Sequence, residues 1–518
     1  MNRWLAVGCL WLIGSSLATA QLFDYSADRD ASLKPCDEHF HSGERPQANS
    51  CYAALLIESD DATVRAEAAW RTGDLQAANA YFRTAVEIEP ESPRARTRWG
   101  RLFLTTHQNS EAIKLFQEAL ELDDEYLPAK LGLAALAAGR FEDRARALVE
   151  EVLEADGSQI EAHLLRARMS LEEGALTLAD ETLSEALRIA EAEELPPLEV
   201  YALNASADLL RGITESDWTE RAVAYNPGFG GIYATPAHFY VITRRYREAI
   251  ELYFEAVRIQ PDLWSAHAKL GGNLLRENRI EEAQAHRAAA YEGNPYSPQV
   301  VNTLRLIDSF DNFQVLNRDL PATGDDSTEV DTPGMILRLH NEEAQVLDPY
   351  VTDLVADSIR RFSERYQFEL REPVVAELYP EPDDFAVRTS GLPGIGLLGV
   401  TFGYLMAMHS PSGRDSDYHW GTTLWHEMAH VFTLEATNHL VPRWFSEGVS
   451  VFEEWSTGPR PGRHVPMQVL DAMEEDKFLS IVELDSGFIR PAYQGQVIVS
   501  YMQAGLICQY IDRNWGQQ

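Results

Sequence analysis

The sequence predicts a multidomain protein, in which an all-α solenoid of short helical repeats is followed by an α+β domain. Two observations carry this prediction. Between residues 59 and 310, small and bulky apolar residues recur with a step of 34 positions, which is typical of stacked helical hairpins. From residue 335 to 518, short β-prone stretches and helical patterns replace this period. The chain has 518 residues, 45% of them hydrophobic, so two or three domains can bury cores of their own.

Residues 1–20 have the pattern of an export signal. Arg3 supplies a positive charge, the apolar run from Trp4 to Ile13 follows, and small residues at 18–20 offer a cleavage site before Gln21. The apolar run is too short to span a bilayer as a stable helix. We therefore expect a soluble mature protein that is exported to the periplasm or secreted, with no stable membrane insertion. A membrane-anchored protein is the alternative if cleavage fails.

The segment from 21 to 58 holds two of the cysteines that remain after this cleavage. Cys36 and Cys51 flank a polar stretch, and an exported protein is expected to join two such cysteines in a disulfide. The alternative is a metal site that also uses His39 and His41, but the Cys-x-x-Cys spacing typical of zinc sites is absent. We predict the disulfide.

The repeats are visible as equivalent residues one period apart. In the first part of the region, Ala78, Phe82 and Ala85 recur 34 residues later as Ala112, Phe116 and Ala119. In the last part, Ala249, Ala256 and Pro261 recur with the same step as Ala283, Ala290 and Pro295. Short side chains let two helices approach closely, and bulky ones fill the groove between neighbouring repeats. These offsets resemble those of the tetratricopeptide repeat, which implies a helical solenoid over residues 59–310.

The period is lost between about 194 and 233. Pro196, Pro197, Pro227 and Gly228 favour a break or an irregular insertion there, so we expect a solenoid in two blocks. A solenoid of this kind presents a concave surface that binds a protein partner or a peptide. The alternative is a spacer or a support for the domain that follows.

Residues 311–334 are predicted to be a linker, because prolines and aspartates are concentrated there. The α+β domain follows. Its expected elements are a strand from Met335 to Leu339, a helix from Asp348 to Phe368, a strand from Val374 to Leu378, a turn from Gly391 to Gly399 and a strand from Val400 to Met408.

The stretch 426–430 (His-Glu-Met-Ala-His) carries the most chemical information. Histidines at i and i+4 share one face of a helix, so both imidazoles can bind one metal ion. Glu427 stays available for proton transfer. Glu447, in the sequence Trp-Phe-Ser-Glu-Gly at 444–448, offers a third ligand from a helix that Pro442 is expected to begin. Three ligands with an open fourth position are typical of catalytic zinc. The alternative is that both histidines only pack or cap a surface helix.

An HExxH sequence followed by WxxEG resembles the gluzincins, and especially the peptidase MA-like group of bacterial metallopeptidases related to aminopeptidase N. The resemblance implies a zincin-type fold, Zn²⁺ bound by His426, His430 and Glu447, and Glu427 as the residue that activates water. Metzincins are excluded, since Thr433 replaces the glycine of that class.

The resemblance also concerns the last strand before the motif helix. In the gluzincins this strand is an edge that pairs with extended substrate, which implies that role for residues 399–408. The alternative is an ordinary strand covered by the solenoid. The Gly-x-Met-Glu-Asn signature of aminopeptidases is missing from this stretch, so the resemblance gives aminopeptidase activity no support.

The expected mechanism assigns further roles. Glu427 takes a proton from water and passes it to the leaving amine. A developing oxyanion needs a donor besides the metal, and gluzincins often use a downstream Tyr or His. Tyr493 is the first candidate and Tyr501 the second. Glu453 and Glu454 are candidates for supporting a zinc-binding histidine, although we expect at least one of them to be an exposed surface charge.

The charge of the chain restricts its partners. Asp and Glu number 81 against 44 Lys and Arg, and the formal net charge is -37. No basic block is present, so neither nucleic acid nor an anionic membrane surface is an expected partner. We expect a peptide or an unfolded protein as the substrate, and a protein partner for the repeats.

Taken together, the sequence predicts an exported zinc metallopeptidase that hydrolyses peptide bonds. The main alternative is a non-catalytic repeat scaffold with a degenerate peptidase domain, although binding alone does not require Glu427. A zinc hydrolase acting on another bond is a further alternative. Cys508 is expected to be a buried thiol in a final apolar helix, after which we expect that the domain is truncated or unusually short.

Overall fold

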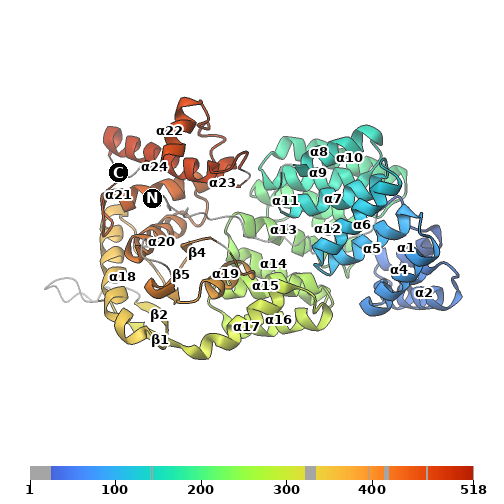
Figure 1. Cartoon of the computed structure of the whole chain (residues 1–518), viewed down its shortest axis with the longest axis horizontal. Helices are drawn as coiled ribbons and strands as arrows, with labels where there is room; N and C mark the ends of the chain where they lie inside the picture. Colours follow the sequence, from blue (N-terminus) through green and yellow to red (C-terminus); the bar gives the residue numbers. More distant parts are fainter. Residues whose placement is uncertain are drawn as a thin grey trace.

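The computed structural model describes residues 25–140, 142, 144–320, 334–394, 396–413, 419–462, 465–489 and 491–516. The predicted export signal lies outside the described residues. Two regions are visible in Figure 1: helices α1 to α17 form a curved stack, and the second region holds a small sheet together with helices α18 to α24. The chain is therefore a helical repeat region followed by a region of mixed helices and strands, as the sequence predicts.

The first helices are held together by a disulfide. After the short helix η1 (Ala31–Leu33), Cys36 in α1 (Lys34–His41) is bonded to Cys51 in α2 (Arg45–Glu58), and their Cα atoms are 5.3 Å apart. The predicted disulfide is thus present. His39, named in the alternative metal site, instead pairs with Glu44, with 2.5 Å between Nδ1 and Oε2.

The repeats are consecutive helical hairpins. They are α3 (Ala62–Arg71) with α4 (Leu75–Ile88), α5 (Pro93–Thr105) with α6 (Asn109–Leu122), α7 (Leu127–Gly139) with α8 (Arg144–Ala155), α9 (Ile160–Glu172) with α10 (Leu176–Ala192), α11 (Leu198–Leu210) with α12 (Asp217–Tyr225), α13 (Gly231–Ile242) with α14 (Tyr246–Ile259), and α15 (Trp264–Arg276) with α16 (Ile280–Gly293). Helix α17 (Pro298–Asp308) and the short helix η2 (Ser309–Asn312) complete this region.

Packing between hairpins explains the sequence period. The ring of Phe116 fills a groove that only glycines leave open: a Cβ atom at residue 100 or 132 would lie 2.7 or 2.5 Å from that ring. The hairpin turns repeat as well, since His107 and Arg244 have φ of 60° and 62° at equivalent places in their turns. A residue in the left-handed backbone conformation closes each of these tight turns. In the first hairpin this residue is Gly73, with a φ of 89°.

The prediction of a break or an irregular insertion between about 194 and 233 is wrong, because this segment is helical. Helices α11 and α12 lie within it, and α13 begins there. Pro197 is the N-cap of α11, and the turn at 226–230 separates α12 from α13. The period is hidden because this part of the stack buries the N-terminal helices: Tyr52 and Phe40 share a core with Leu198 and Phe229. The repeat stack is continuous from α3 to α16.

A mixed five-stranded sheet forms the centre of the second region. Its strands are β1 (Phe313–Arg318), β2 (Met335–His340), β3 (Val374–Tyr379), β4 (Gly399–Thr401) and β5 (Leu405–His409), in the order β1-β2-β3-β5-β4. Strands β2, β3 and β5 are parallel, while β1 and β4 are antiparallel to their neighbours. The parallel register places Met335 opposite Val374 and Val375 opposite Leu405.

Both faces of the sheet are covered. Alternate residues of β2, such as Leu337 and Leu339, pack with Val355 of α18 (Ala344–Tyr366) and Met428 of α20 (Trp420–Ala436). The opposite face packs on α19 (Pro382–Ser390) and on the last repeats, through one core that joins residues of α14 and α15 to β4 and β5. Figure 1 shows α14 to α17 beside this face. The repeat region therefore completes the core of the second region.

Two predictions for this region are corrected. The predicted linker at 311–334 contains β1, which pairs with β2 in antiparallel register; residues 321–333 are not described. The single strand predicted from Val400 to Met408 is a hairpin of β4 and β5, and Gly403 turns the chain with a φ of 103°. Only a glycine adopts this backbone conformation without strain, so one continuous strand was not possible.

The last helices pack around α21 (Arg443–Ser456). They are α22 (Met467–Glu474), α23 (Ser486–Ile489) and α24 (Gln496–Trp515). At Gly448 a Cβ atom would lie 2.7 Å from the Ala504 carbonyl oxygen and 2.8 Å from Cys508 Sγ, so α21 and α24 approach closely. The Cys508 thiol is free and buried, and burial raises its pKa to about 12. The prediction of a buried thiol is confirmed.

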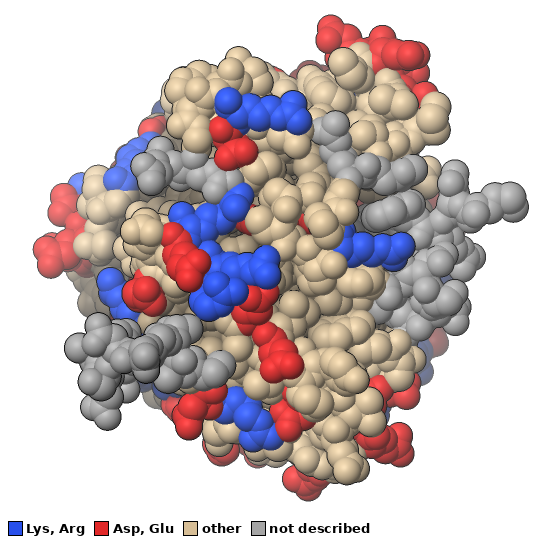
Figure 2. Space-filling model, turned by 90° about the vertical axis from the view of Figure 1, so that its left-hand side faces the viewer, with Lys and Arg blue, Asp and Glu red and all other residues tan. Residues whose placement is uncertain are grey.

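The surface carries mixed charge on the face of the second region. Figure 2 shows basic and acidic side chains next to one another on that face rather than separated by sign. Pairs such as Arg318 with Asp348, 2.5 Å apart, have this arrangement. Among the described residues, none of the helices has both the length and the apolar character needed to cross a bilayer.

Candidate metal centre

The motif helix α20 is buried along most of its length. Residues 423–434 are all buried, including Trp425 and Phe432, whose rings lie 5.0 and 5.6 Å from that of Phe362 in α18. His419 caps the N-terminus of α20 by accepting a hydrogen bond from the Thr422 amide, at 3.0 Å. The sheet on one side and α21 on the other hold this helix, so its polar residues are fixed in place by packing.

Three side chains converge between α20 and α21. His430 Nε2 lies 3.1 Å from His426 Nε2 and 3.0 Å from Glu447 Oε2, and His426 Nε2 lies 3.6 Å from the same Oε2. A tetrahedral zinc ion about 2.0–2.1 Å from each ligand would require separations of roughly 3.3 Å. All three residues are buried, and they are the one group of this kind within the described residues. The donor set and its spacing fit zinc.

The outer nitrogens of both histidines are held by α21. Glu454 Oε1 is hydrogen-bonded to His426 Nδ1, and Ser446 Oγ lies 2.8 Å from His430 Nδ1. Thr433 Oγ1 lies 2.8 Å from the same Ser446 Oγ. These partners fix the ring orientations, so that Nε2 of each histidine faces Glu447. Such second contacts are typical of histidines that bind metals.

Glu447 is oriented by positive charge from two sides. Its Oε1 lies 3.6 Å from Arg443 Nε and 3.9 Å from Arg244 Nη2, while its Oε2 faces the histidines. Burial would raise the pKa of Glu447, but His430, His426 and Arg443 lower it more, so the pKa lies well below its usual value. Glu447 is therefore a carboxylate, the form that binds a metal. Arg244 belongs to the α13–α14 turn, so the repeat region reaches this centre.

Glu427 points toward the edge of the sheet. Thr401 Oγ1 in β4 donates a hydrogen bond of 2.7 Å to Glu427 Oε2, while Glu427 Oε1 is buried and has no hydrogen-bond partner among the described residues. Burial raises the pKa of Glu427 to about 7. A buried carboxylate with one free oxygen can accept a proton near neutral pH, as a general base must.

Gly399 makes room for this carboxylate, which leads to a prediction. A Cβ atom at residue 399 would lie 2.6 Å from Glu427 Oε1, so Gly399→Ala must displace the carboxylate. We expect metal binding to persist and any hydrolytic activity to fall on the order of 10²-fold, because small misplacements of a reacting group have effects of this size. The measurement is kcat/KM beside zinc content. Gly396→Ala, where no atom of the described residues lies within 4 Å of the added Cβ, is the control and should be neutral.

The two tyrosine candidates lie in different places. Tyr493 precedes α24 and packs under Lys477, whose Nζ is 5.1 Å from its ring; no described contact joins it to the three converging residues. Tyr501 is buried in α24, and its ring centre is 6.4 Å from that of His426. Of the two, Tyr501 is the one beside the candidate centre. The role predicted for Tyr493 stays a prediction.

The two glutamates of α21 have separate partners. Glu454 supports His426, as described above. Glu453 is fully buried and accepts hydrogen bonds from Tyr366 Oη at 2.7 Å, while Arg365 Nε lies 2.7 Å from the same carboxylate. The expectation that at least one is an exposed surface charge is wrong. Helix α18 covers this side of α21, and the sequence did not reveal that packing.

Sequence reasoning missed Thr401, Ser446 and Arg244. Ser446 directly precedes Glu447, and it lies one helical turn before Ser450 on the buried face of α21. This position next to a predicted ligand was the signal in the sequence that could have identified it. Arg244 occupies the left-handed turn position that Gly73 fills in the first hairpin, and a large residue there is an unusual choice. Thr401 gave no signal, because its contact depends on how β4 meets α20.

Comparisons with known proteins concern the repeats. A family model described as tetratricopeptide repeat matches residues 63–126, so the predicted presence of tetratricopeptide repeats is confirmed for that part of the chain. No curated protein matches the chain. The matches carry no evidence for a peptidase family.

Similar solved structures share low identity with the chain. The Cut9–Hcn1 hetero-tetramer of APC/C matches with 16% identity and a TM-score of 0.36, over 57% of this chain and 58% of that one. A tetratricopeptide repeat protein from Parabacteroides merdae has 16% identity and a TM-score of 0.33, over 50% and 98%. A monomeric mutant of IFIT1 with Gppp-AAAA has 15% identity and a TM-score of 0.35, over 57% and 75%.

Proposed function

We propose that this protein is an exported, zinc-dependent metallopeptidase. The observation that supports this most is the convergence of His426, His430 and Glu447 through one nitrogen or oxygen each, at separations that suit one zinc ion. The neighbouring Glu427 adds a buried carboxylate with a free oxygen. Metal ligands of this kind beside such a carboxylate suit hydrolysis by activated water.

Some residues of the centre would bind the metal, and another would transfer protons. His426, His430 and Glu447 would hold the metal, while Glu454 and Ser446 keep the two imidazoles oriented. A zinc ion at this position would supply Lewis-acid chemistry, which polarises a carbonyl group and makes water acidic enough to lose a proton near neutral pH. Glu427 Oε1 would accept that proton and return it to the leaving amine, with Thr401 holding the other oxygen.

An extended peptide is the substrate that the surroundings favour. Strand β4 is at the edge of the sheet, with β5 as its strand neighbour, and its residue Thr401 holds Glu427. A peptide paired with this edge through its backbone would run past the carboxylate. Pairing through the backbone suits many sequences, so unfolded proteins are suitable substrates. The repeats would bind a protein partner or part of the substrate, in keeping with the general use of such solenoids.

The first experiment measures metal and hydrolysis together. We expect one zinc per chain in the purified protein and in His39→Ala, whose histidine lies far from the centre in a surface pair with Glu44. His430→Ala should lose both the zinc and the hydrolysis of unfolded casein. Absence of zinc after incubation with the metal would contradict the proposal. Zinc without hydrolysis of any unfolded protein would favour the non-catalytic scaffold.

A further inference from the structure

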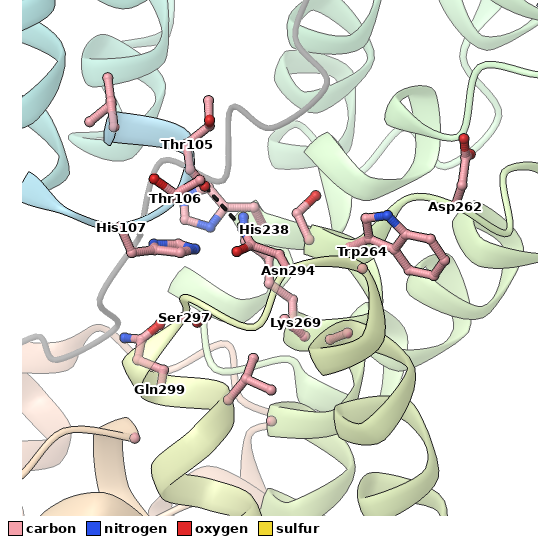
Figure 3. Close-up of a pocket in the computed structure, with 18 of the residues that line it drawn as sticks. Thr105, Thr106, His107, His238, Asp262, Trp264, Lys269, Asn294, Ser297 and Gln299 are labelled. Carbon is pink, nitrogen blue, oxygen red and sulfur yellow. Dashed lines mark hydrogen bonds between the residues drawn. The ribbon is translucent and has the colours of Figure 1, made fainter. Parts of the chain in front are cut away.

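A cavity of about 550 Å³ lies inside the curve of the repeat region, away from the metal centre. Its walls come from early and late repeats, because Thr105 ends α5 and His107 follows that helix, while Lys269 and Ser297 belong to the last repeats (Figure 3). Asn294 donates a hydrogen bond of 3.1 Å to the Thr105 carbonyl oxygen and so joins the two ends. A volume of this size is typical of sites for small molecules.

The cavity is lined by cations, and only some of them are paired. Arg101 pairs with Glu161 at 2.6 Å and Arg168 with Glu199 at 3.2 Å. Four further cations form no ion pair among the described residues. Arg71 lies over the ring of Phe40, with 5.2 Å to the ring centre, and the other three are Lys269, Arg276 and Arg287. Arg276 has a neutral partner, since its Nη1 donates to Asn273 Oδ1 at 2.7 Å. The lining therefore holds an excess of positive charge in a chain whose formal net charge is -37.

Arg287 is the most buried of these cations. It is 9% exposed, and its Nε has no hydrogen-bond partner among the described residues. Its side chain lies across two glycines of α15: a Cβ atom would be 2.8 Å from Arg287 Cγ at Gly271 and 2.7 Å from Nη2 at Gly272. The glycine pair leaves the space that this side chain occupies. The hydroxyl of Tyr253, which also lines the cavity and is fully buried, has no partner either.

Such an arrangement is unfavourable without a ligand. Burying an unpaired charge costs several kcal/mol in general, and like charges close together add to the cost. Burial lowers the pKa of Lys269 to about 8, with Arg168 adding to the effect. Burial and the charge of Arg276 likewise lower the pKa of Arg287 to about 10. An anion in the cavity would remove both penalties.

We propose that this cavity binds a small organic anion with two or more negatively charged groups, held by Lys269, Arg276 and Arg287. Two or more groups are required because the cations come from different places on α15 and α16, so a single oxyanion cannot satisfy all of them. Hydroxyl and amide groups in the wall, including those of Ser297 and Gln299, would orient the ligand (Figure 3). Carboxylates and phosphates share this chemistry.

The test titrates metal-free full-length protein with tricarballylate and, separately, with pyrophosphate at constant ionic strength, by calorimetry. Metal-free protein keeps chelation of zinc out of the signal. We expect saturable binding of at least one of the two at one site per chain, which identifies the preferred group, and a rise in Tm with ligand concentration. The double variant Lys269→Met with Arg287→Met should weaken binding at least ~10-fold, the effect of losing about 1.4 kcal/mol.

The same variant has a second readout that a structural role would not produce. Without ligand, its Tm should rise, because two cations that have no ion-pair partner among the described residues are gone from the cavity wall. Lys114→Met, on the exposed face of α6, is the control and should bind like the unaltered chain. Absence of saturable binding of both anions to the unaltered chain would overturn the proposal. Unchanged affinity in the folded double variant would also overturn it. A result in which a peptide of four glutamates binds but neither small anion does would overturn it as well.

Discussion

Glu427→Gln is expected to keep its zinc and to hydrolyse peptides at least ~10²-fold more slowly, which is the range in which a general base contributes. The amide has nearly the same shape as the carboxylate and can still accept a hydrogen bond from Thr401. It cannot take a proton from water. The three converging residues are not altered, so zinc content and the fold should be unchanged.

The measurement is kcat/KM on an unfolded protein or a quenched peptide, with zinc content from the same preparation. Glu435→Gln is a matched control, because Glu435 lies on the same helix and pairs with His439 at 3.1 Å without contacting the candidate ligands. Hydrolysis retained in Glu427→Gln would show that another group activates water. Loss of zinc in this variant would show instead that Glu427 supports the site structurally.

The parts of this centre that the sequence predicted are those set by local spacing. His426 and His430 share a face of α20 because they are four residues apart, and helix geometry alone brings their Nε2 atoms together. Glu447 could be predicted as the third ligand because Pro442 indicates where the next helix begins. In the structure Pro442 is the N-cap of α21. These are short-range relations that hold in any fold.

The remaining contacts depend on packing between distant elements. Thr401 meets Glu427 because β4 crosses α20, and Arg244 meets Glu447 because the repeat stack curves back onto the sheet. Neither contact has a signature in the local sequence. The hairpin at Gly403 was missed for a related reason. A glycine within a β-prone stretch is compatible with a continuous strand or with a bend, and here the pairing of β4 with β5 determines that it is a bend.

The helices at 198–225 show a different limit. Their residues keep helical periodicity but not the spacing of the repeat, since Leu198 and Ala222 share a core with the disulfide-linked N-terminal helices as well as with their neighbours. A family pattern describes helices that contact only adjacent repeats. Where a segment has an additional partner, the pattern fails although the helices remain.

Glu377→Ala is expected to lower the free energy of unfolding by about 3–5 kcal/mol, the usual cost of removing one partner from a buried ionic network. Glu377 is fully buried in β3 and binds two arginines: Arg338 Nη1 at one oxygen, and Arg388 Nε, 2.6 Å from the other. Tyr379 Oη donates a further hydrogen bond of 2.9 Å. Removing the carboxylate leaves two buried guanidinium groups without an acidic partner.

This network also ties the two regions together, which makes its loss more costly. Arg388 Nη2 donates to the Leu275 carbonyl oxygen at 2.8 Å, and Arg338 Nη2 to Asn278 Oδ1 at 3.0 Å, both in the repeat region. Glu372 is a matched control, since it pairs across the same boundary with Arg247 at 2.8 Å but is half exposed. Glu372→Ala should cost less than about 1 kcal/mol.

Urea unfolding of both variants, followed by tryptophan fluorescence, measures the difference. The pH dependence should agree with it. Burial would raise the pKa of Glu377, but Arg388 and Arg338 lower it more, so the pKa is below its usual value. A depressed pKa gives stability that is present at neutral pH and lost as pH falls below the ordinary range of a glutamate and through the lower folded-state pKa. The alanine variant lacks this contribution at every pH, so the two chains should converge in stability in acid. Equal costs for Glu377→Ala and Glu372→Ala would contradict a buried network at this boundary.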